Sequence, residues 1–172
     1  FSRSHGPFMK GPWDREKQLA FSKEVAAEIG YDFNRGSLDL TSHPFCTSPA
    51  APHDVRITTR VSEDNFTSNL YGVIHESGHA MYEQGLDPEW EHTPLCDSIS
   101  LGIHESQSLF WENEIGRSEA FWSHFLPKMC QYFPGTLEGV SAREMANAVN
   151  PVRPSLIRVE ADEVTYGLHI AL

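Results

Sequence analysis

The sequence contains no long apolar run. No stretch approaches the roughly eighteen consecutive apolar residues that a membrane-spanning helix requires. The first residues also lack a positively charged segment followed by an apolar one, the pattern of a secretory signal. We therefore expect neither a membrane anchor nor export.

Basic residues are few. The 172-residue chain has 13 lysines and arginines against 24 aspartates and glutamates, which gives a net charge of −11. A chain of this charge repels the phosphate groups of nucleic acids and of anionic lipid surfaces. Nucleic acid and membrane are therefore not expected as partners.

Cysteine is scarce as well. Cys46, Cys96 and Cys130 are odd in number, far apart and without C-x-x-C spacing. This usage fits free thiols in a reducing compartment better than a disulfide framework. A cytoplasmic location is the resulting expectation.

The length and the 40% hydrophobic content suit one globular domain with a sizeable core. The chain starts at Phe1 without a methionine and stops at Leu172 inside a periodic run that carries no helix-ending signal. We interpret residues 1–172 as part of a larger catalytic domain.

Most of the chain has helical periodicity. Phe21, Val25 and Ile29 recur every four residues, and Gly30 follows as a suitable helix end. Asp64 is expected to cap a long core helix, and Pro127 is expected to end another. We predict helices over residues 13–29, 64–85, 98–125 and 141–149, and a further helix that starts near residue 156.

Residues 54–61 alternate instead. Val55, Ile57, Thr59 and Val61 share one face, and charged or polar residues that include Arg56 occupy the other. Strict alternation is typical of a strand with one buried face. The sequence therefore predicts a mainly α fold, with a small β element near the long helix that follows.

That long helix carries the string His75-Glu76-Ser77-Gly78-His79, the H-E-x-x-H pattern. Residues four apart on a helix lie on one face, so both imidazoles can bind one metal ion. Gly72 and Gly78 leave room for another segment to approach this face. The alternative interpretation is a pair of surface histidines beside a solvated glutamate.

An open catalytic zinc site needs a third protein ligand. Tyr82 and Gly85 stand where the extended H-E-x-x-H-x-x-G-x-x-H pattern requires Gly and His, which excludes that class. Antiparallel packing of the next long helix would present Glu105, our choice for the third ligand. Spacing alone leaves four rival ligands open: His92, His104, Glu112 and Glu114. Of these, His104 is the better candidate for a residue that supports the site without binding the metal.

These residues predict peptide hydrolysis. Zinc would activate a water molecule, and Glu76 would act as general base and then pass the proton to the leaving amine. Zn2+ is the expected cofactor, with Co2+ as an alternative divalent metal.

Four strings occur in a fixed order: Asp54-Val55-Arg56-Ile57-Thr58, His75 to His79, His104-Glu105-Ser106-Gln107, and Ile157-Arg158-Val159-Glu160-Ala161-Asp162. In this the chain resembles the carboxypeptidase Taq family from about Gly11 onward. The resemblance implies a mostly helical metallocarboxypeptidase with a deep groove, which removes C-terminal residues from peptides and often forms homodimers.

The resemblance also assigns residues. It implies His75, His79 and Glu105 as metal ligands, Glu76 as general base, and Arg158 near the terminal carboxylate of the substrate. A guanidinium suits that task, although Arg158 could equally form an ion pair with Glu160 or Asp162. Arg56 would line the groove or brace the neighbouring helix.

Part of the family pattern is absent. The later G-x-x-Q-D-x-H-W signature and the N-terminal helical region are not in this chain. Missing oxyanion donors alone can cost about 10²–10³ in rate, so weak or no activity is expected for residues 1–172 alone. The alternative functions are another zinc endo- or aminopeptidase and a non-catalytic metal-binding remnant.

Overall fold

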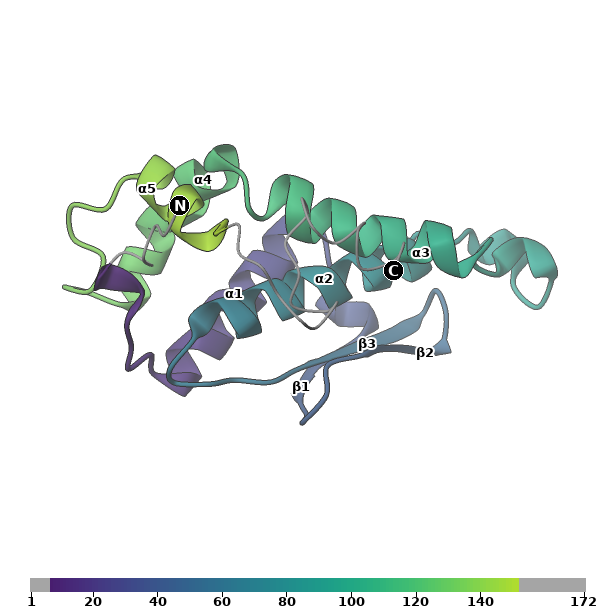
Figure 1. The fold of residues 1–172 in the computed structure, drawn as a ribbon. Helices are drawn as coiled ribbons and strands as arrows, with labels where there is room; N and C mark the ends of the chain where they lie inside the picture. Colours follow the sequence, from purple (N-terminus) through teal and green to yellow (C-terminus); the bar gives the residue numbers. More distant parts are fainter. Residues whose placement is uncertain (1–6, 152–172) are drawn as a thin grey trace, which may run out of the picture.

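Helix α2 (Phe66–Gln84) lies at the centre of the computed structural model, which describes residues 7–151 (Figure 1). Helix α1 (Arg15–Ile29), strand β3 (Asp54–Thr59) and helix α3 (Leu101–Leu109) all pack against it. The remaining elements are η1 (Pro7–Met9), η2 (Phe33–Arg35), β1 (Leu38–Leu40), β2 (Cys46–Ala50), η3 (Pro88–Trp90), η4 (Pro94–Cys96), the π-helix η5 (Phe110–Ile115), α4 (Glu119–Tyr132) and α5 (Ala142–Val149). The predicted mainly α fold with a small β element is confirmed.

Local signals explain most helix ends. Asp14 caps α1 by accepting a hydrogen bond from the backbone N–H of Lys17, and Gly30 ends the helix with a φ of 122°. At the start of α2 the cap is Asn65, not the predicted Asp64, because the Asn65 side chain accepts from the Thr67 N–H. The boundaries of these two helices were therefore close to the predicted ones.

Strand β3, which the alternating segment forms, is the central strand of a three-stranded sheet. The strand order is β1-β3-β2, with β1 parallel and β2 antiparallel to β3. Val55, Ile57 and Thr59 are fully buried, and the first two belong to a core cluster with Val73 of α2. The predicted strand is confirmed but ends at Thr59. The short strands β1 and β2 were not predicted.

The helix predicted over residues 98–125 is wrong. The structure has α3, then the π-helix, then a break before α4. Ser118 starts α4 anew, because its hydroxyl accepts from the Phe121 N–H. Pro127 lies inside α4 and does not end it, since buried Leu126 and Met129 hold the following turn in the core. Helix α5 is confirmed, and the helix predicted near residue 156 lies outside the described residues.

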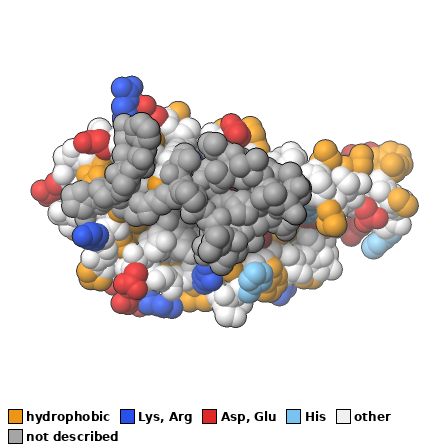
Figure 2. Space-filling model, in the orientation of Figure 1, with side chains coloured by type: hydrophobic (Ala, Val, Ile, Leu, Met, Phe, Trp, Pro, Cys, Tyr) orange, Lys and Arg blue, Asp and Glu red, His pale blue; other side chains and the backbone are white. Residues whose placement is uncertain are grey.

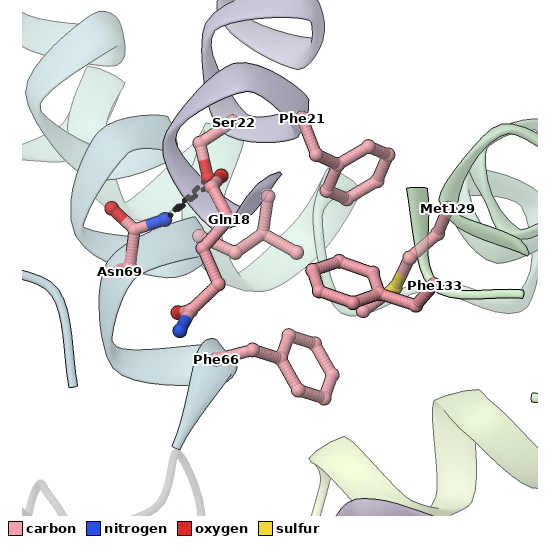
Figure 3. Close-up of a pocket in the computed structure, with 8 residues that line it drawn as sticks. Gln18, Phe21, Ser22, Phe66, Asn69, Met129 and Phe133 are labelled. Carbon is pink, nitrogen blue, oxygen red and sulfur yellow. Dashed lines mark hydrogen bonds between the residues drawn. The ribbon is translucent and has the colours of Figure 1, made fainter. Parts of the chain in front are cut away.

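A buried polar network fixes α2 against its neighbours. Asn69 donates to the hydroxyl of Ser22 on α1 over 2.7 Å (Figure 3). It also accepts from the hydroxyl of Thr59 on β3 over 3.1 Å. Asn69 and Ser22 also line a small pocket between α1, α2 and α4, together with Gln18, Phe21, Phe66, Leu70, Met129 and Phe133. The network therefore sets the position of the helix that carries the H-E-x-x-H string.

One end of the molecule projects from the body and exposes hydrophobic side chains, seen in orange at the right of Figure 2. Leu95 and Ile99 in the segment between α2 and α3 are 67% and 78% exposed, and Leu101 at the start of α3 is 88% exposed. Among the helices of residues 7–151, none combines the length and the apolar character needed to cross a membrane.

Candidate metal centre

The site forms where α3 crosses α2 at Gly78. A Cβ atom at Gly78 would lie 2.7 Å from the Cα of Ser108 and 2.8 Å from the carbonyl oxygen of Gln107. Only glycine permits this approach, so the two helix backbones come close beside His79. Gly72 has no such role, because a Cβ there would be 3.7 Å from the nearest atom.

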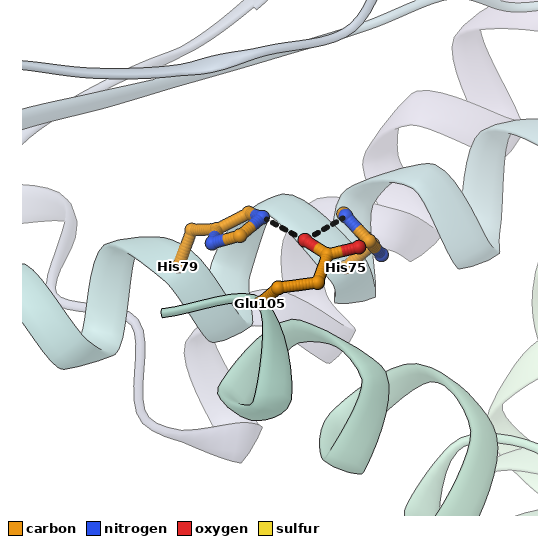
Figure 4. A group of neighbouring side chains, drawn as sticks. All are labelled: His75, His79 and Glu105. Atoms are coloured by element: carbon orange, nitrogen blue, oxygen red, sulfur yellow. Dashed lines mark ion pairs between the residues drawn. The ribbon is translucent and has the colours of Figure 1, made fainter. Parts of the chain in front are cut away.

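Three donor atoms converge at this crossing. Glu105 Oε2 lies 3.2 Å from His79 Nε2 and 3.8 Å from His75 Nε2 (Figure 4). Four ligand atoms around a zinc ion at about 2.0–2.1 Å stand about 3.3 Å from one another. The two distances to Glu105 are therefore close to what one ion requires, and all three donor atoms lie within 4.8 Å of one another.

His75 has a second partner on its other nitrogen. Glu112 Oε2 lies 2.9 Å from His75 Nδ1, and Arg117 holds the second carboxylate oxygen of Glu112 over 2.9 Å. The π-helix presents Glu112: the Gly116 N–H bonds to the Trp111 carbonyl, five residues earlier. A π-helical turn at a functional site is a recurring feature of proteins.

His79 is held in the same way through a longer chain. Its Nδ1 lies 2.6 Å from His104 Nδ1, and His104 Nε2 lies 2.7 Å from Glu83 Oε1. Both ligand candidates thus have Nδ1 engaged on the protein side. Their Nε2 atoms face Glu105.

The Glu105 side chain is also oriented. The Ser108 hydroxyl lies 3.1 Å from Glu105 Oε2 and 2.7 Å from the Glu105 carbonyl, so it can donate to either. Ser108 is fully buried, whereas the Glu105 side chain is 48% exposed. A buried hydroxyl therefore orients a carboxylate that otherwise faces solvent.

Glu76 of α2 has a different environment from these groups. It is 8% exposed, and within residues 7–151 no hydrogen bond or ion pair reaches its carboxylate. Burial raises the pKa of Glu76 to about 7, with further contributions from the charges of Glu105 and Glu112 and an opposing one from His75. An unpaired carboxyl of this kind is suited to exchange a proton near neutral pH.

The two histidines differ in charge preference. Burial, followed by electrostatic interaction with the His75 and His104 rings, lowers the pKa of His79 to about 4. For His75 burial acts in the same direction, but the hydrogen bond and charge of Glu112 outweigh it and raise the pKa. His79 is therefore neutral at pH 7, as a metal-binding imidazole must be.

The donor chemistry fits a divalent metal. Two imidazoles and one carboxylate form a known three-ligand set for catalytic zinc, which leaves a fourth position open. Within the part of the chain that the structure describes, His75, His79 and Glu105 are the one group of this kind, with all ligand atoms within 4.8 Å of each other. The residues present therefore fit the cofactor that the sequence suggested.

The rival ligands fall elsewhere. His92 and Glu114 are exposed and outside this group, while Glu112 and His104 contact the Nδ1 sides of the two histidines. Arg56 makes all its hydrogen bonds among the described residues to Asp54 of its own strand. Arg158 lies outside the described residues.

Three residues that support the site were not predicted. Glu83 follows His79 by four residues, so helical spacing alone could have placed it on the same face. Ser108 follows Glu105 by three residues in the same way. Arg117 could not have been found, because a helix of ordinary pitch does not bring it to Glu112.

Comparison with known proteins identifies a family. A sequence model described as carboxypeptidase Taq (M32) metallopeptidase matches residues 2–172. The chain is 52% identical over 159 residues to Thermostable carboxypeptidase 1 of Thermus thermophilus, which covers 92% of this chain and 31% of that protein. It is 46% identical over 165 residues to Carboxypeptidase 1 of Bacillus subtilis, covering 96% and 33%. The chain thus spans about a third of the length of these relatives.

Solved structures give the same result. The M32 carboxypeptidase of Deinococcus radiodurans superimposes with a TM-score of 0.89 at 52% identity, covering 95% of this chain and 33% of that one. Metallocarboxypeptidase 1 of Trypanosoma cruzi gives a TM-score of 0.86 at 44% identity, covering 94% and 32%.

Proposed function

The chain belongs to the carboxypeptidase Taq (M32) metallopeptidase family, and from this premise we propose that it forms the metal-binding part of a metallocarboxypeptidase. Such an enzyme hydrolyses the last peptide bond of a polypeptide. The observation that carries the proposal is the convergence of His75 Nε2, His79 Nε2 and Glu105 Oε2 from two helices.

We propose that His75, His79 and Glu105 hold a zinc ion, with Co2+ as an alternative. When bound, the metal supplies a Lewis acid that polarises the scissile carbonyl and acidifies water. The engaged Nδ1 atoms of both histidines support this assignment, because metal-bound histidines commonly donate their other N–H to an outer partner.

Glu76 is the proposed general base. Its carboxylate is next to His75, is largely buried and has no partner among residues 7–151. It would accept a proton from the attacking water and return it to the nitrogen of the leaving residue. The Glu76 carboxylate would be free to take up this proton, because no group among residues 7–151 forms a hydrogen bond or ion pair with it.

Arg158 is the proposed group for the terminal carboxylate of the peptide, and Arg56 is a second proposed substrate-binding residue, which would line the groove. A guanidinium binds a carboxylate through two parallel hydrogen bonds. For Arg56, the ion pair with Asp54 has an Nη2–Oδ2 distance of 2.6 Å and is exposed at the surface, so a substrate would have to compete with Asp54. Arg158 is therefore the stronger proposal of the two.

The family also leads us to propose peptide and protein C-termini as substrates, a homodimer and a cytoplasmic location. The free thiols of Cys46, Cys96 and Cys130 suit a reducing compartment. Residues 1–172 alone are expected to show weak or no turnover, because the chain spans a third of its relatives.

The test uses a chimera in which this chain replaces the matching segment of the Thermus thermophilus relative. Two peptides of one sequence are compared, one blocked at its N-terminus and the other amidated at its C-terminus. Release of the last residue from the first peptide alone, abolished by a chelator and restored by zinc, supports the proposal. A folded, zinc-loaded chimera that cleaves the amidated peptide equally well, or cleaves neither, contradicts it; the unmodified relative is the assay control.

A further inference from the structure

His79 and His104 contact each other through ring nitrogens, either of which can carry the shared proton. His79 Nδ1 and His104 Nδ1 lie 2.6 Å apart, so a hydrogen bond there requires one proton, on one of the two atoms. Where this proton sits decides which nitrogen of His79 is free. The neighbouring carboxylate settles the matter.

An ionised glutamate has no proton to donate, so the Glu83 carboxylate acts as an acceptor. Its Oε1 lies 2.7 Å from His104 Nε2, so the proton of neutral His104 sits on Nε2 and its Nδ1 becomes an acceptor. His79 must then donate from Nδ1. The direction of the whole chain, from His79 to His104 to Glu83, leaves the His79 Nε2 lone pair free toward Glu105.

The hydrogen bonds from His79 to His104 and from His104 to Glu83 are also held rigidly. The side chains of His104 and Glu83 are 17% and 14% exposed, so water competes little for these bonds. The Tyr82 ring packs edge-on against His104 with a centroid distance of 5.1 Å, and the Tyr82 hydroxyl accepts from the Ile99 N–H. His104 therefore has little freedom to turn its Nδ1 away from His79.

We propose that His104 and Glu83 are positioning residues, which fix His79 in the tautomer and orientation that bind the metal. This inference rests on the proposed function, since it assumes His79 as a ligand. It assigns a role to the histidine that precedes Glu105 and to the glutamate one helical turn after His79. Neither touches the metal or the substrate.

The experiment compares His104→Phe, which keeps a ring but removes the acceptor, with His104→Gln, which keeps an acceptor and a donor. His124→Phe is the matched control, because His124 forms a 2.6 Å pair with Glu28 at the surface, away from the site. Zinc affinity and stoichiometry are measured by titration calorimetry on the 172-residue chain. Two-dimensional ¹H–¹⁵N spectra of the metal-free imidazoles report the tautomer of His79.

We expect His104→Phe to weaken zinc binding about 10–100-fold while the stoichiometry stays at one, with a smaller effect for His104→Gln and none for the control. In the spectra, His79 should carry its proton on Nδ1 in the unmodified chain and lose this preference in His104→Phe. If His104→Phe fails to fold, Glu83→Gln replaces it, with an expected loss at the lower end of that range.

Three results would overturn the inference. Zinc affinity in His104→Phe equal to that of the control would show that the hydrogen bonds to His104 and Glu83 do not influence zinc binding. Complete loss of zinc, as in His79→Ala, would make His104 a ligand. A proton on Nε2 of His79 in the unmodified metal-free chain would contradict the derived direction, whereas absence of zinc binding with the proton on Nδ1 would refute the proposed function and leave the tautomer argument standing.

Discussion

At the scale of single residues, the site separates groups that share one chemistry. Glu76, Glu105 and Glu112 are all glutamates, yet Glu76 is buried with no partner among residues 7–151, Glu105 is half exposed and Glu112 is paired with Arg117. Burial raises the pKa of Glu76, whereas the hydrogen bond from His75, together with Arg117, outweighs burial and lowers the pKa of Glu112. The environment therefore leaves Glu76 as the carboxyl suited to proton transfer.

Glu76→Gln tests this assignment. The substitution keeps size and shape but removes the basic oxygen, so zinc content should stay at the unmodified level. The turnover number of the chimera should fall by about 10²–10⁴-fold, the usual contribution of a general base. Elemental analysis and an initial-rate assay give the two numbers. Glu16→Gln on α1, an exposed position, is the control and should change neither; near-normal turnover in Glu76→Gln would remove Glu76 from the mechanism.

At the scale of elements, the crossing of α2 and α3 sets the donor spacing. Glu105 reaches the two histidines because Gly78 lets Ser108 and Gln107 approach the α2 backbone. The π-helix then continues the α3 axis and brings Glu112 to the other side of His75. Residues beside the proposed ligands, on two helices in contact, therefore determine the geometry of the site.

Gly78→Ala should disturb this crossing. The new methyl group would overlap backbone atoms of α3, and overpacking of this kind costs about 1–3 kcal/mol of stability. Gly72→Ala is the matched control on the same helix, where the methyl group has ordinary contact distances and alanine favours the helix by about 1 kcal/mol. Denaturant unfolding and zinc titration should show losses for Gly78→Ala alone; equal behaviour of both variants would contradict the close-crossing argument.

The capping box of α5 predicts a pH effect on stability. The backbone N–H and the hydroxyl of Ser141 bond to the Glu144 carboxylate and lower its pKa below the ordinary value of 4.5. A depressed folded-state pKa contributes stability that is present above pH 4.5 and lost as the pH falls through the folded value. Glu144→Gln should therefore reduce the drop in melting temperature between pH 7 and pH 3. An unchanged drop would show that this carboxylate contributes nothing to acid sensitivity.

Periodicity predicted the elements whose signals are local. Helices α1, α2 and α5 and strand β3 follow from apolar spacing and end signals, with shifts of a few residues. The predicted helix 98–125 failed because a π-helical turn and a new cap at Ser118 depend on packing that the pattern does not encode. Strands β1 and β2 are short and exposed, so they left no apolar alternation to detect.

The site followed the same division. Spacing on one helix predicted that His75 and His79 share a face, and the structure places them so. The approach of Glu105 to the two histidines depends on a contact between two helices. Sequence spacing could not predict this contact, so four rival residues remained open as the third ligand. The outer partners of the histidines depend on tertiary contacts as well, and only Glu83 had a local signal.

At the scale of the whole molecule, the chain corresponds to one part of its longer relatives. It spans about a third of its relatives, and large hydrophobic side chains remain exposed at its projecting end (Figure 2). Exposed apolar side chains of this size mark surfaces that other segments or chains commonly cover. All three proposed ligands nevertheless lie within this third.

Zinc should therefore stabilise the chain. A ligand that binds the folded state alone raises the free energy of unfolding by about 2.7 kcal/mol at a concentration 100 times its Kd. The melting temperature in a thermal scan should rise when zinc is added and fall again with a chelator. Magnesium, which prefers oxygen ligands, is the control metal and should have a smaller effect. An unchanged melting temperature with zinc would show that the chain has no preformed site.

The central claim is that His75, His79 and Glu105 bind one metal ion, and its most direct test is the zinc content of the purified chain by elemental analysis, with and without Glu105→Ala. Glu114→Ala is the control, since Glu114 is an exposed glutamate on the adjacent π-helix outside the donor group. The account predicts about one zinc per chain in the unmodified protein and the control, because three protein ligands suffice for one ion, and a sharply reduced content in Glu105→Ala. Undiminished zinc in Glu105→Ala, or no zinc in any of the three proteins, would contradict it.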